Sequence, residues 1–257
     1  MREDSLSAEL IPRNLKTHFT GQRVIYLPRV TSTMEVARRE AERGAPEGTI
    51  VTAGEQMAGR GRLQRAWLSP QGSVALSLIL RPGTVQLPYL IMVVSLAVAY
   101  SIEAVTGLKP VIKWPNDVLI NDKKVCGILI ENKVRGSTVQ YAITGIGVNV
   151  NLKMTDFPEF QPIATSLSDE LCRNVSRLNL VRALLVEIER LYLSLPGSVY
   201  EEWRDRLVTL GKRVSVRWGD TLYEGVAESV ERDGCLFVRQ ADGNLVKVVA
   251  GDASLRS

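Results

Sequence analysis

Histidine and cysteine are scarce in this 257-residue sequence, and their scarcity excludes several kinds of chemistry. His18 is the only histidine, so catalysis by a nucleophile that needs a histidine base is not expected. The three cysteines, Cys126, Cys172 and Cys235, are widely spaced and form no C-x-x-C pair. This spacing argues against a zinc site and a disulfide framework, and it favours a reducing, cytoplasmic location.

Long hydrophobic runs are also missing. The N-terminus lacks the charged and then apolar pattern of a signal peptide. The stretch from Pro82 to Ile102 carries no charge, but its apolar part, Tyr89 to Ile102, is shorter than the ~20 residues that a membrane span needs. We therefore expect a buried helix here and no membrane partner.

Acidic residues are absent between Glu55 and Glu103, where Arg60, Arg62 and Arg65 lie close together in a glycine-containing segment. The whole chain has 32 Lys and Arg against 28 Asp and Glu, so its net charge is only +4 and the basicity is local. Local basicity favours a compact anion over a nucleic acid, because guanidinium groups bind carboxylate and phosphate bidentately. A solvated basic loop is the alternative. The segment fits neither a helix nor a strand and is expected to be a loop.

Hydrophobic periodicity predicts an α+β fold with a mixed β-sheet. A helix begins at Ser32, whose side chain would form a capping box with Glu35, and it stops near Gly44. Strands are expected at Thr49–Ala53 and Ser73–Leu80, a buried helix at Pro88–Val105, four β-rich runs from Val111 to Val150, and two amphipathic helices after them. We divide the chain into residues 1–210, a larger domain, and residues 211–257, a small barrel of short strands that leans on it.

The segment "KWPND", Lys113 to Asp117, is a second candidate site. Lys113 follows Ile112 on an apolar strand, where a charged side chain needs a sheet edge or a bound anion. Asn116 and Asp117 can hydrogen-bond their own backbone, so a turn is the alternative for them.

The segment "GIGVNVN" is a third candidate. With the period of two of a strand, Gly145, Gly147 and Asn149 share one face. Two residues without side chains would form a flat floor for a planar ligand, with the amide of Asn149 at its end; glycines at a β-bulge are the alternative.

These segments together resemble the biotin protein ligase family, the biotin–[acetyl-CoA-carboxylase] ligases. The resemblance rests on four motifs in order, "GRGRLQRAW" (59–67), "KWPNDVLI" (113–120), "KKVCGILIE" (123–131) and "GIGVNVN" (145–151). It implies a catalytic domain related to class II aminoacyl-tRNA synthetases and an SH3-like C-terminal domain. Residues 1–23, which precede the first expected strand, are too few for the N-terminal DNA-binding domain of some members, so the short form is expected.

The resemblance also implies roles for individual residues. The contacts with biotin fall to Ser32, Thr33, Gln56, Arg60, Gly61, Arg62 and Lys113. The contacts with the nucleotide fall to Arg62, Arg65, Trp67, Asn116 and Asn149. Lys113 and Arg62 would be the catalytic cations. Met34 departs from the family pattern, which usually has Asn at this position.

The implied activity is ATP-dependent formation of biotinoyl-5′-AMP, with Mg²⁺ on the phosphates, followed by transfer to a lysine of the biotin carboxyl carrier protein of acetyl-CoA carboxylase. The arginine segment would then be a lid that closes on the adenylate. A homodimer is possible, with the "VQYAITG" strand (139–145) serving as a sheet edge. A lipoate or octanoate ligase or transferase of the same fold is one alternative. A nucleic-acid-binding regulator is another, disfavoured by the low net charge.

Overall fold

The computed structural model describes residues 6–249 and 251–256. Its larger part is built on a seven-stranded sheet in the order β1-β2-β5-β9-β8-β7-β6. The strands are β1 (Val24–Leu27), β2 (Ile50–Ala53), β5 (Val74–Leu80), β6 (Val111–Lys113), β7 (Asp117–Ile120), β8 (Lys123–Arg135) and β9 (Thr138–Val148). Strands β1 and β2 are parallel and all other neighbours are antiparallel, so the predicted mixed sheet is confirmed.

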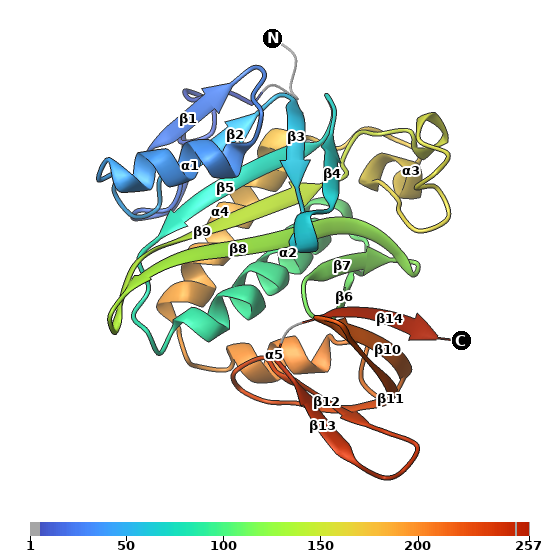
Figure 1. Ribbon diagram of the computed structural model, residues 1–257. Helices are drawn as coiled ribbons and strands as arrows, with labels where there is room; N and C mark the ends of the chain where they lie inside the picture. Colours follow the sequence, from blue (N-terminus) through green and yellow to red (C-terminus); the bar gives the residue numbers. More distant parts are fainter. Residues whose placement is uncertain (1–5, 250, 257) are drawn as a thin grey trace.

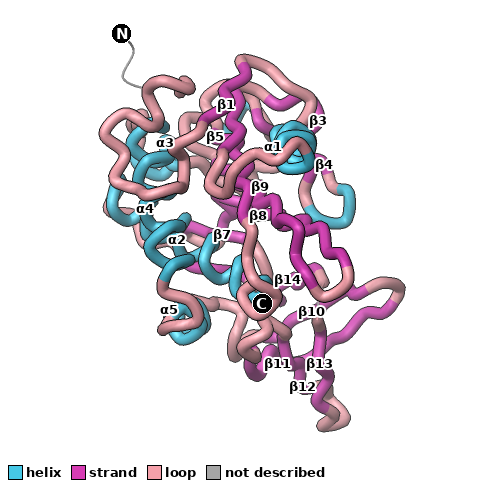
Figure 2. Tube along the Cα trace, turned by 90° about the vertical axis from the view of Figure 1, so that its left-hand side faces the viewer, coloured by secondary structure: helices cyan, strands magenta, loops and turns pink. Residues whose placement is uncertain are grey.

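Helices cover one face of the sheet more fully than the other (Figures 1 and 2). Helices α2 (Leu90–Thr106) and α4 (Arg177–Leu193) lie on one side, and α1 (Thr33–Glu42) lies on the other, next to strands β3 (Gln56–Arg60) and β4 (Ala66–Ser69). The remaining helices are α3 (Leu167–Leu171), α5 (Val199–Asp205) and the short 3₁₀ turns η1 (Arg62–Gln64), η2 (Leu87–Tyr89) and η3 (Met154–Asp156). On the face beside α1, the β3–β4 hairpin lies over the centre of the sheet (Figure 1).

Helix α2 is the uncharged stretch expected to be buried. Together with the η2 turn before it, as Leu87–Thr106, it is long and apolar enough to cross a membrane, but most of the α2 side chains are buried between the sheet and α4. Burial on all sides explains why the helix lacks a polar stripe. The prediction of a core helix is confirmed.

The C-terminal part is a five-stranded antiparallel sheet in the order β13-β12-β11-β10-β14. Its strands are β10 (Arg213–Trp218), β11 (Thr221–Val230), β12 (Leu236–Arg239), β13 (Leu245–Val248) and β14 (Asp252–Arg256). The buried side chains of this small barrel belong to the same apolar cluster as the main core. The indole nitrogen of Trp114 also donates to the carbonyl of Gly234, at 2.8 Å. This hydrogen bond links the barrel to the larger part of the chain.

Two local expectations are wrong. The arginine segment is a hairpin of β3 and β4 rather than a loop. Its strand residues, "QMAGR" and "AWLS", show no alternation of apolar and polar residues in the sequence. The capping box at the start of α1 is absent, because the hydroxyl of Ser32 makes no capping hydrogen bond. Ser32 is nevertheless buried, so its hydroxyl is left for another partner.

Candidate functional site

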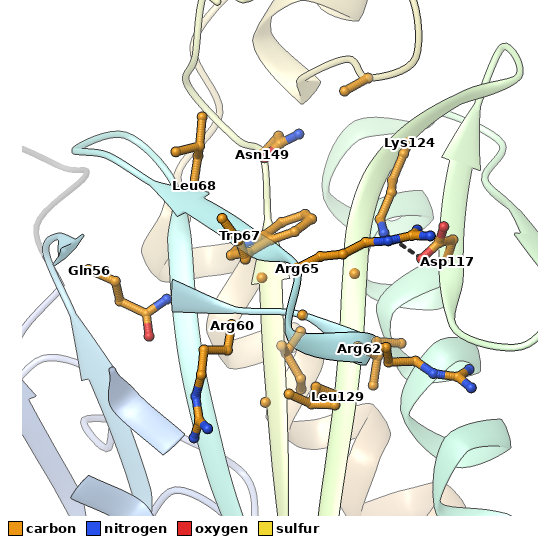
Figure 3. Close-up of a pocket in the computed structure, with 18 of the residues that line it drawn as sticks. Gln56, Arg60, Arg62, Arg65, Trp67, Leu68, Asp117, Lys124, Leu129 and Asn149 are labelled. Carbon is orange, nitrogen blue, oxygen red and sulfur yellow. Dashed lines mark ion pairs between the residues drawn. The ribbon is translucent and has the colours of Figure 1, made fainter. Parts of the chain in front are cut away.

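A cavity of about 270 Å³ lies on the α1 side of the sheet, beneath the β3–β4 hairpin (Figure 3). All but one of the residues expected at the site line it: Ser32, Thr33, Gln56, Arg60, Gly61, Arg62, Arg65, Trp67, Asn116 and Asn149. Residues that are up to 117 positions apart in the sequence, from Ser32 to Asn149, therefore meet at one place. Lys113 is the residue that does not line the cavity.

The floor of the cavity is a row of small residues across the sheet. In the strand register Ala75 lies opposite Gly147, and Gly147 lies opposite Gly127. A Cβ atom at Gly147 would be 2.2 Å from Nε1 of Trp67, and one at Gly127 would be 3.0 Å from Cζ3 of the same ring. The predicted flat floor exists, and in this structure the planar group resting on it is the indole of Trp67.

Met34 fills the next position along the floor. A Cβ atom at Gly145 would be 2.6 Å from the sulfur of Met34, so the glycine gives the methionine its space. Met34 also packs with Ala37 and Ile79 beneath α1. The departure from the family pattern at Met34 thus places an apolar side chain in the cavity wall.

One end of the cavity is polar. The backbone nitrogen and the hydroxyl of Thr33 both donate to Oε1 of Gln56, at 2.8 and 3.0 Å. Ser32 lines the same end and keeps its hydroxyl free of helix capping. Hydrogen-bonding groups on an otherwise buried wall select a ligand by the pattern of its donors and acceptors.

The cations of the hairpin reach the cavity from above. Arg60 lies 3.8 Å from Glu131, measured from Nη2 to Oε1, and within the described residues its Nε and Nη2 are buried without a hydrogen-bond partner. Nη1 of Arg62 donates to Oδ1 of Asn116 at 3.3 Å. In Figure 3 the side chain of Arg65 extends toward Lys124 and Asp117. The two buried nitrogens of Arg60 are suited to a bound anion.

The lysine that lines the cavity is Lys124, and Lys113 does not line it. Nζ of Lys124 lies 2.6 Å from Oδ1 of Asp117 and 5.3 Å from the ring centre of Trp67. In the register, Gly127 lies opposite Asp117, and Asp117 lies opposite Lys113. Strand β7 therefore separates Lys113 from the glycine floor and leaves it on the edge strand, which is the alternative weighed for it from the sequence.

Sequence reasoning missed one whole wall of the cavity. It is apolar and comes from the segment after β9, with Leu152, Met154, Phe157, Phe160 and Ile163. This segment is fixed beside Lys124, whose backbone nitrogen donates to the carbonyl of Ile163. Nδ2 of Asn149 donates to the carbonyl of Thr165 and so holds the same segment. The two phenylalanines in "DFPEFQP" could have indicated an apolar segment at the site.

Models of known families match both parts of the chain. Residues 26–149 match the biotin/lipoate A/B protein ligase family, and residues 209–256 match the biotin protein ligase C terminal domain. The two matches coincide with the seven-stranded sheet and with the small barrel.

Individual proteins are similar over most of their length. The bifunctional ligase/repressor BirA of Bacillus subtilis is 36% identical over 97% of this chain and 79% of its own length. The biotin–[acetyl-CoA-carboxylase] ligase of Paracoccus denitrificans is 33% identical over 86% of this chain and 95% of its own. The solved structure of biotin protein ligase from Aquifex aeolicus in complex with biotin and ATP has a TM-score of 0.77 and 29% identity, covering 91% of this chain and 99% of that one.

Proposed function

We propose, since this chain belongs to the biotin protein ligase family, that its cavity activates biotin with ATP as biotinoyl-5′-AMP and transfers the biotinoyl group to a lysine of a carrier protein. The sequence prediction of this family is confirmed, and the relatives do not favour the lipoate or octanoate alternative. The observation that carries the proposal is the meeting of the hairpin arginines, Trp67 and Lys124 over one glycine floor.

The first half-reaction needs charge neutralisation more than proton transfer. The carboxylate of biotin is already ionised at neutral pH, so its attack on the α-phosphorus of ATP requires no general base. Two anions must approach each other, and at an effective dielectric of about 20 their repulsion costs several kcal/mol. Arg60, Arg62 and Lys124 line the cavity and can offset that repulsion.

Lys124 takes the role that the resemblance had given to Lys113. Its ammonium group is held by Asp117 at 2.6 Å, so the cation is positioned before any ligand enters. An oxygen of the α-phosphate or of biotin can then join the same ammonium group, which has three hydrogens. Preorganised charge of this kind is effective because it needs no rearrangement during the reaction.

The two ligands are assigned to different parts of the cavity. The biotin ring system belongs at the polar end with Ser32, Thr33 and Gln56. The adenine is assigned to the apolar wall that includes Phe157 and Phe160. The bond between carboxylate and phosphate would form beside Lys124, whose ammonium group lies 5.3 Å from the ring centre of Trp67.

Mg²⁺ would be carried mainly by the ATP phosphates. Among the described residues no three His, Cys, Asp or Glu side chains come together as a metal-binding group. Asp117 supplies one carboxylate at the cavity, which fits the habit of Mg²⁺ of using one or two carboxylates plus phosphate oxygens and water. Bound there, the metal would neutralise part of the phosphate charge.

In the second half-reaction a lysine amine of the carrier attacks the carbonyl carbon of the mixed anhydride. A new amide bond forms, the bond between this carbon and the phosphate oxygen breaks, and AMP leaves. The β3–β4 hairpin must exclude water until the carrier arrives, because the anhydride is hydrolysable.

The remaining parts of the proposal concern the setting of the reaction. The carrier is the biotin carboxyl carrier protein of acetyl-CoA carboxylase, a choice supported by the names of the relatives from Paracoccus denitrificans and Mycobacterium tuberculosis. A cytoplasmic location agrees with the free thiols of Cys126, Cys172 and Cys235. A homodimer stays part of the proposal, but the expected route is wrong: the "VQYAITG" strand (139–145) lies in β9, which pairs with β8 and, from Ala142 on, with β5, so it is not a sheet edge.

Exchange of labelled pyrophosphate into ATP tests the first half-reaction. We expect exchange that depends on biotin and is not supported by lipoate or octanoate. Exchange that required lipoate or octanoate, or no exchange with any of the three acids, would contradict the proposed function.

A further inference from the structure

Two buried serines beneath the polar end of the cavity are connected to its ligand-facing groups. Oγ of Ser77 donates to Oγ1 of Thr33 at 2.8 Å, and Nε2 of Gln56 donates to Oγ of Ser69 at 2.9 Å. Ser69 is 2% exposed and Ser77 is fully buried, and neither is among the residues that line the cavity. Together with the two bonds between Thr33 and Gln56, they form a chain that runs Ser77, Thr33, Gln56, Ser69.

The chain has only one possible direction. A hydroxyl group has a single hydrogen, and Thr33 uses its own to donate to Gln56, so it must accept the hydrogen of Ser77. Oε1 of Gln56 accepts twice from Thr33, which occupies both of its lone pairs. If the amide of Gln56 were rotated by half a turn, its NH₂ group would face the backbone N–H of Thr33. Two donors would then face each other, so this orientation is excluded.

Because the direction of the chain is fixed, Gln56 can form only one further hydrogen bond, in which it is the donor. One hydrogen of Nε2 goes to Ser69, and among the described residues the other has no partner. The side chain of Gln56 points toward the cavity (Figure 3). Gln56 can therefore present a hydrogen-bond donor to a ligand, but no acceptor.

We propose that Ser69 and Ser77 are positioning residues that hold Gln56 as a donor to an acceptor atom of the biotin ring system, for which the ureido oxygen is the strongest candidate. The inference rests on the proposed function, because it assigns the ring system to this end of the cavity. Neither serine touches the ligand; each acts by limiting the orientations of a side chain that does.

The test compares Ser69→Ala and Ser77→Ala with the wild type in the pyrophosphate exchange. The matched control is Ser101→Ala, which removes another buried hydroxyl, one that donates only to the carbonyl of Val98 in α2. We expect the KM for biotin to rise about tenfold in both site variants, the effect of about one hydrogen bond, with kcat and the KM for ATP unchanged. Ser69→Thr retains a hydroxyl group and should restore the KM for biotin.

A second arm reverses the polarity of the contact. In iminobiotin a protonated nitrogen replaces the ureido oxygen, so the ligand offers a donor where biotin offers an acceptor. The wild type should discriminate against iminobiotin, and Gln56→Glu, which presents an acceptor, should narrow or invert that preference. If an alanine variant fails to fold, the comparison of biotin with iminobiotin still tests whether Gln56 acts as a donor.

The outcomes separate the two claims. If the wild type shows biotin-dependent exchange but both alanine variants match Ser101→Ala, or raise the KM for biotin and ATP equally, the inference is overturned and the proposed function stands. An unchanged preference between biotin and iminobiotin in Gln56→Glu would also overturn it. If the wild type shows no biotin-dependent exchange, the proposed function itself fails.

Discussion

The indole of Trp67 lies directly on Gly147, so close that a Cβ atom at that glycine would be 2.2 Å from Nε1 and 2.4 Å from Cε2. No side chain larger than hydrogen leaves room for the ring there. The relationship connects a strand of the central sheet with a residue of the arginine hairpin. It also holds the ring 5.3 Å below the ammonium group of Lys124.

Gly147→Ala should therefore displace the indole while leaving the strand intact, since β9 is paired on both sides there. We expect the KM for ATP to rise about tenfold, the scale of a moderate overpacking penalty, and the affinity for biotin to change less. The control is Gly83→Ala, where the nearest atom to a new Cβ would be 3.5 Å away. Equal KM values for ATP in the two variants would show that the position of Trp67 does not matter for nucleotide binding.

Lys124→Ala and Lys113→Ala form a matched pair on neighbouring strands. Loss of Lys124 should lower the rate of pyrophosphate exchange about 10²- to 10³-fold, because it removes a preorganised cation from the reacting groups. Lys113→Ala should leave the rate within about twofold, as for other substitutions away from a site. The reverse ranking, measured in the same assay, would restore Lys113 as the catalytic cation.

Arg62→Ala should affect the retention of the intermediate more than the binding of biotin. Arg62 lies on the hairpin that covers the cavity and bonds to Asn116 beneath it. We expect the dissociation constant for biotin to stay within about tenfold, while biotinoyl-5′-AMP escapes and labels free lysines of a bystander protein such as albumin. Arg13→Ala, an exposed arginine outside the site, is the control. Wild-type turnover without bystander labelling would remove Arg62 from this role.

Glu189 should contribute to the stability of the folded protein, and this contribution should be lost in acid. Burial raises the pKa of its carboxyl group, but hydrogen bonds from the backbone of Thr20, His18 and Phe19 and from the His18 ring outweigh burial and lower it to about 2. A lowered pKa in the folded state stabilises the protein above the ordinary value of 4.5, and this contribution is lost as the pH falls from there toward 2.

Glu189→Gln should accordingly lower the free energy of unfolding by about 3 kcal/mol at pH 7. In urea titrations the difference from the wild type should shrink steadily below pH 4.5. Glu228→Gln, which breaks an exposed ion pair with Arg239, should change little at any pH. If the difference in the free energy of unfolding between Glu189→Gln and the wild type were the same at pH 7 and pH 3, the proposed stabilisation by the ionised carboxylate would be refuted.

Much of the site could be predicted because it follows the period of two along strands. Gly145 and Gly147 lie on one face as expected, and they make room for Met34 and Trp67. The pairing of β3 with β4 could not be predicted in this way, since neither strand has one apolar face. The apolar residues of "AWLS" are consecutive, and a register shift between Gln56 and Gly59 interrupts β3, so no alternation can be detected.

Lys124 was missed for a different physical reason. Strict alternation places it on the same face as Cys126, which is fully buried in the core. A bulge in the β7–β8 pairing sets Leu119 opposite Lys124 and Val118 opposite Cys126, so Val125 is an extra residue. The extra residue turns Lys124 to the cavity side, and nothing in the sequence marks the position of a bulge that lacks glycine.

A crystal structure of the protein with bound biotinoyl-5′-AMP tests the central claim most directly. We predict that the phosphate lies within hydrogen-bond distance of Nζ of Lys124 and of the guanidinium group of Arg62, with the ureido group beside Gln56. A phosphate beside Lys113, or one beyond the reach of both Lys124 and the hairpin arginines, would contradict the account.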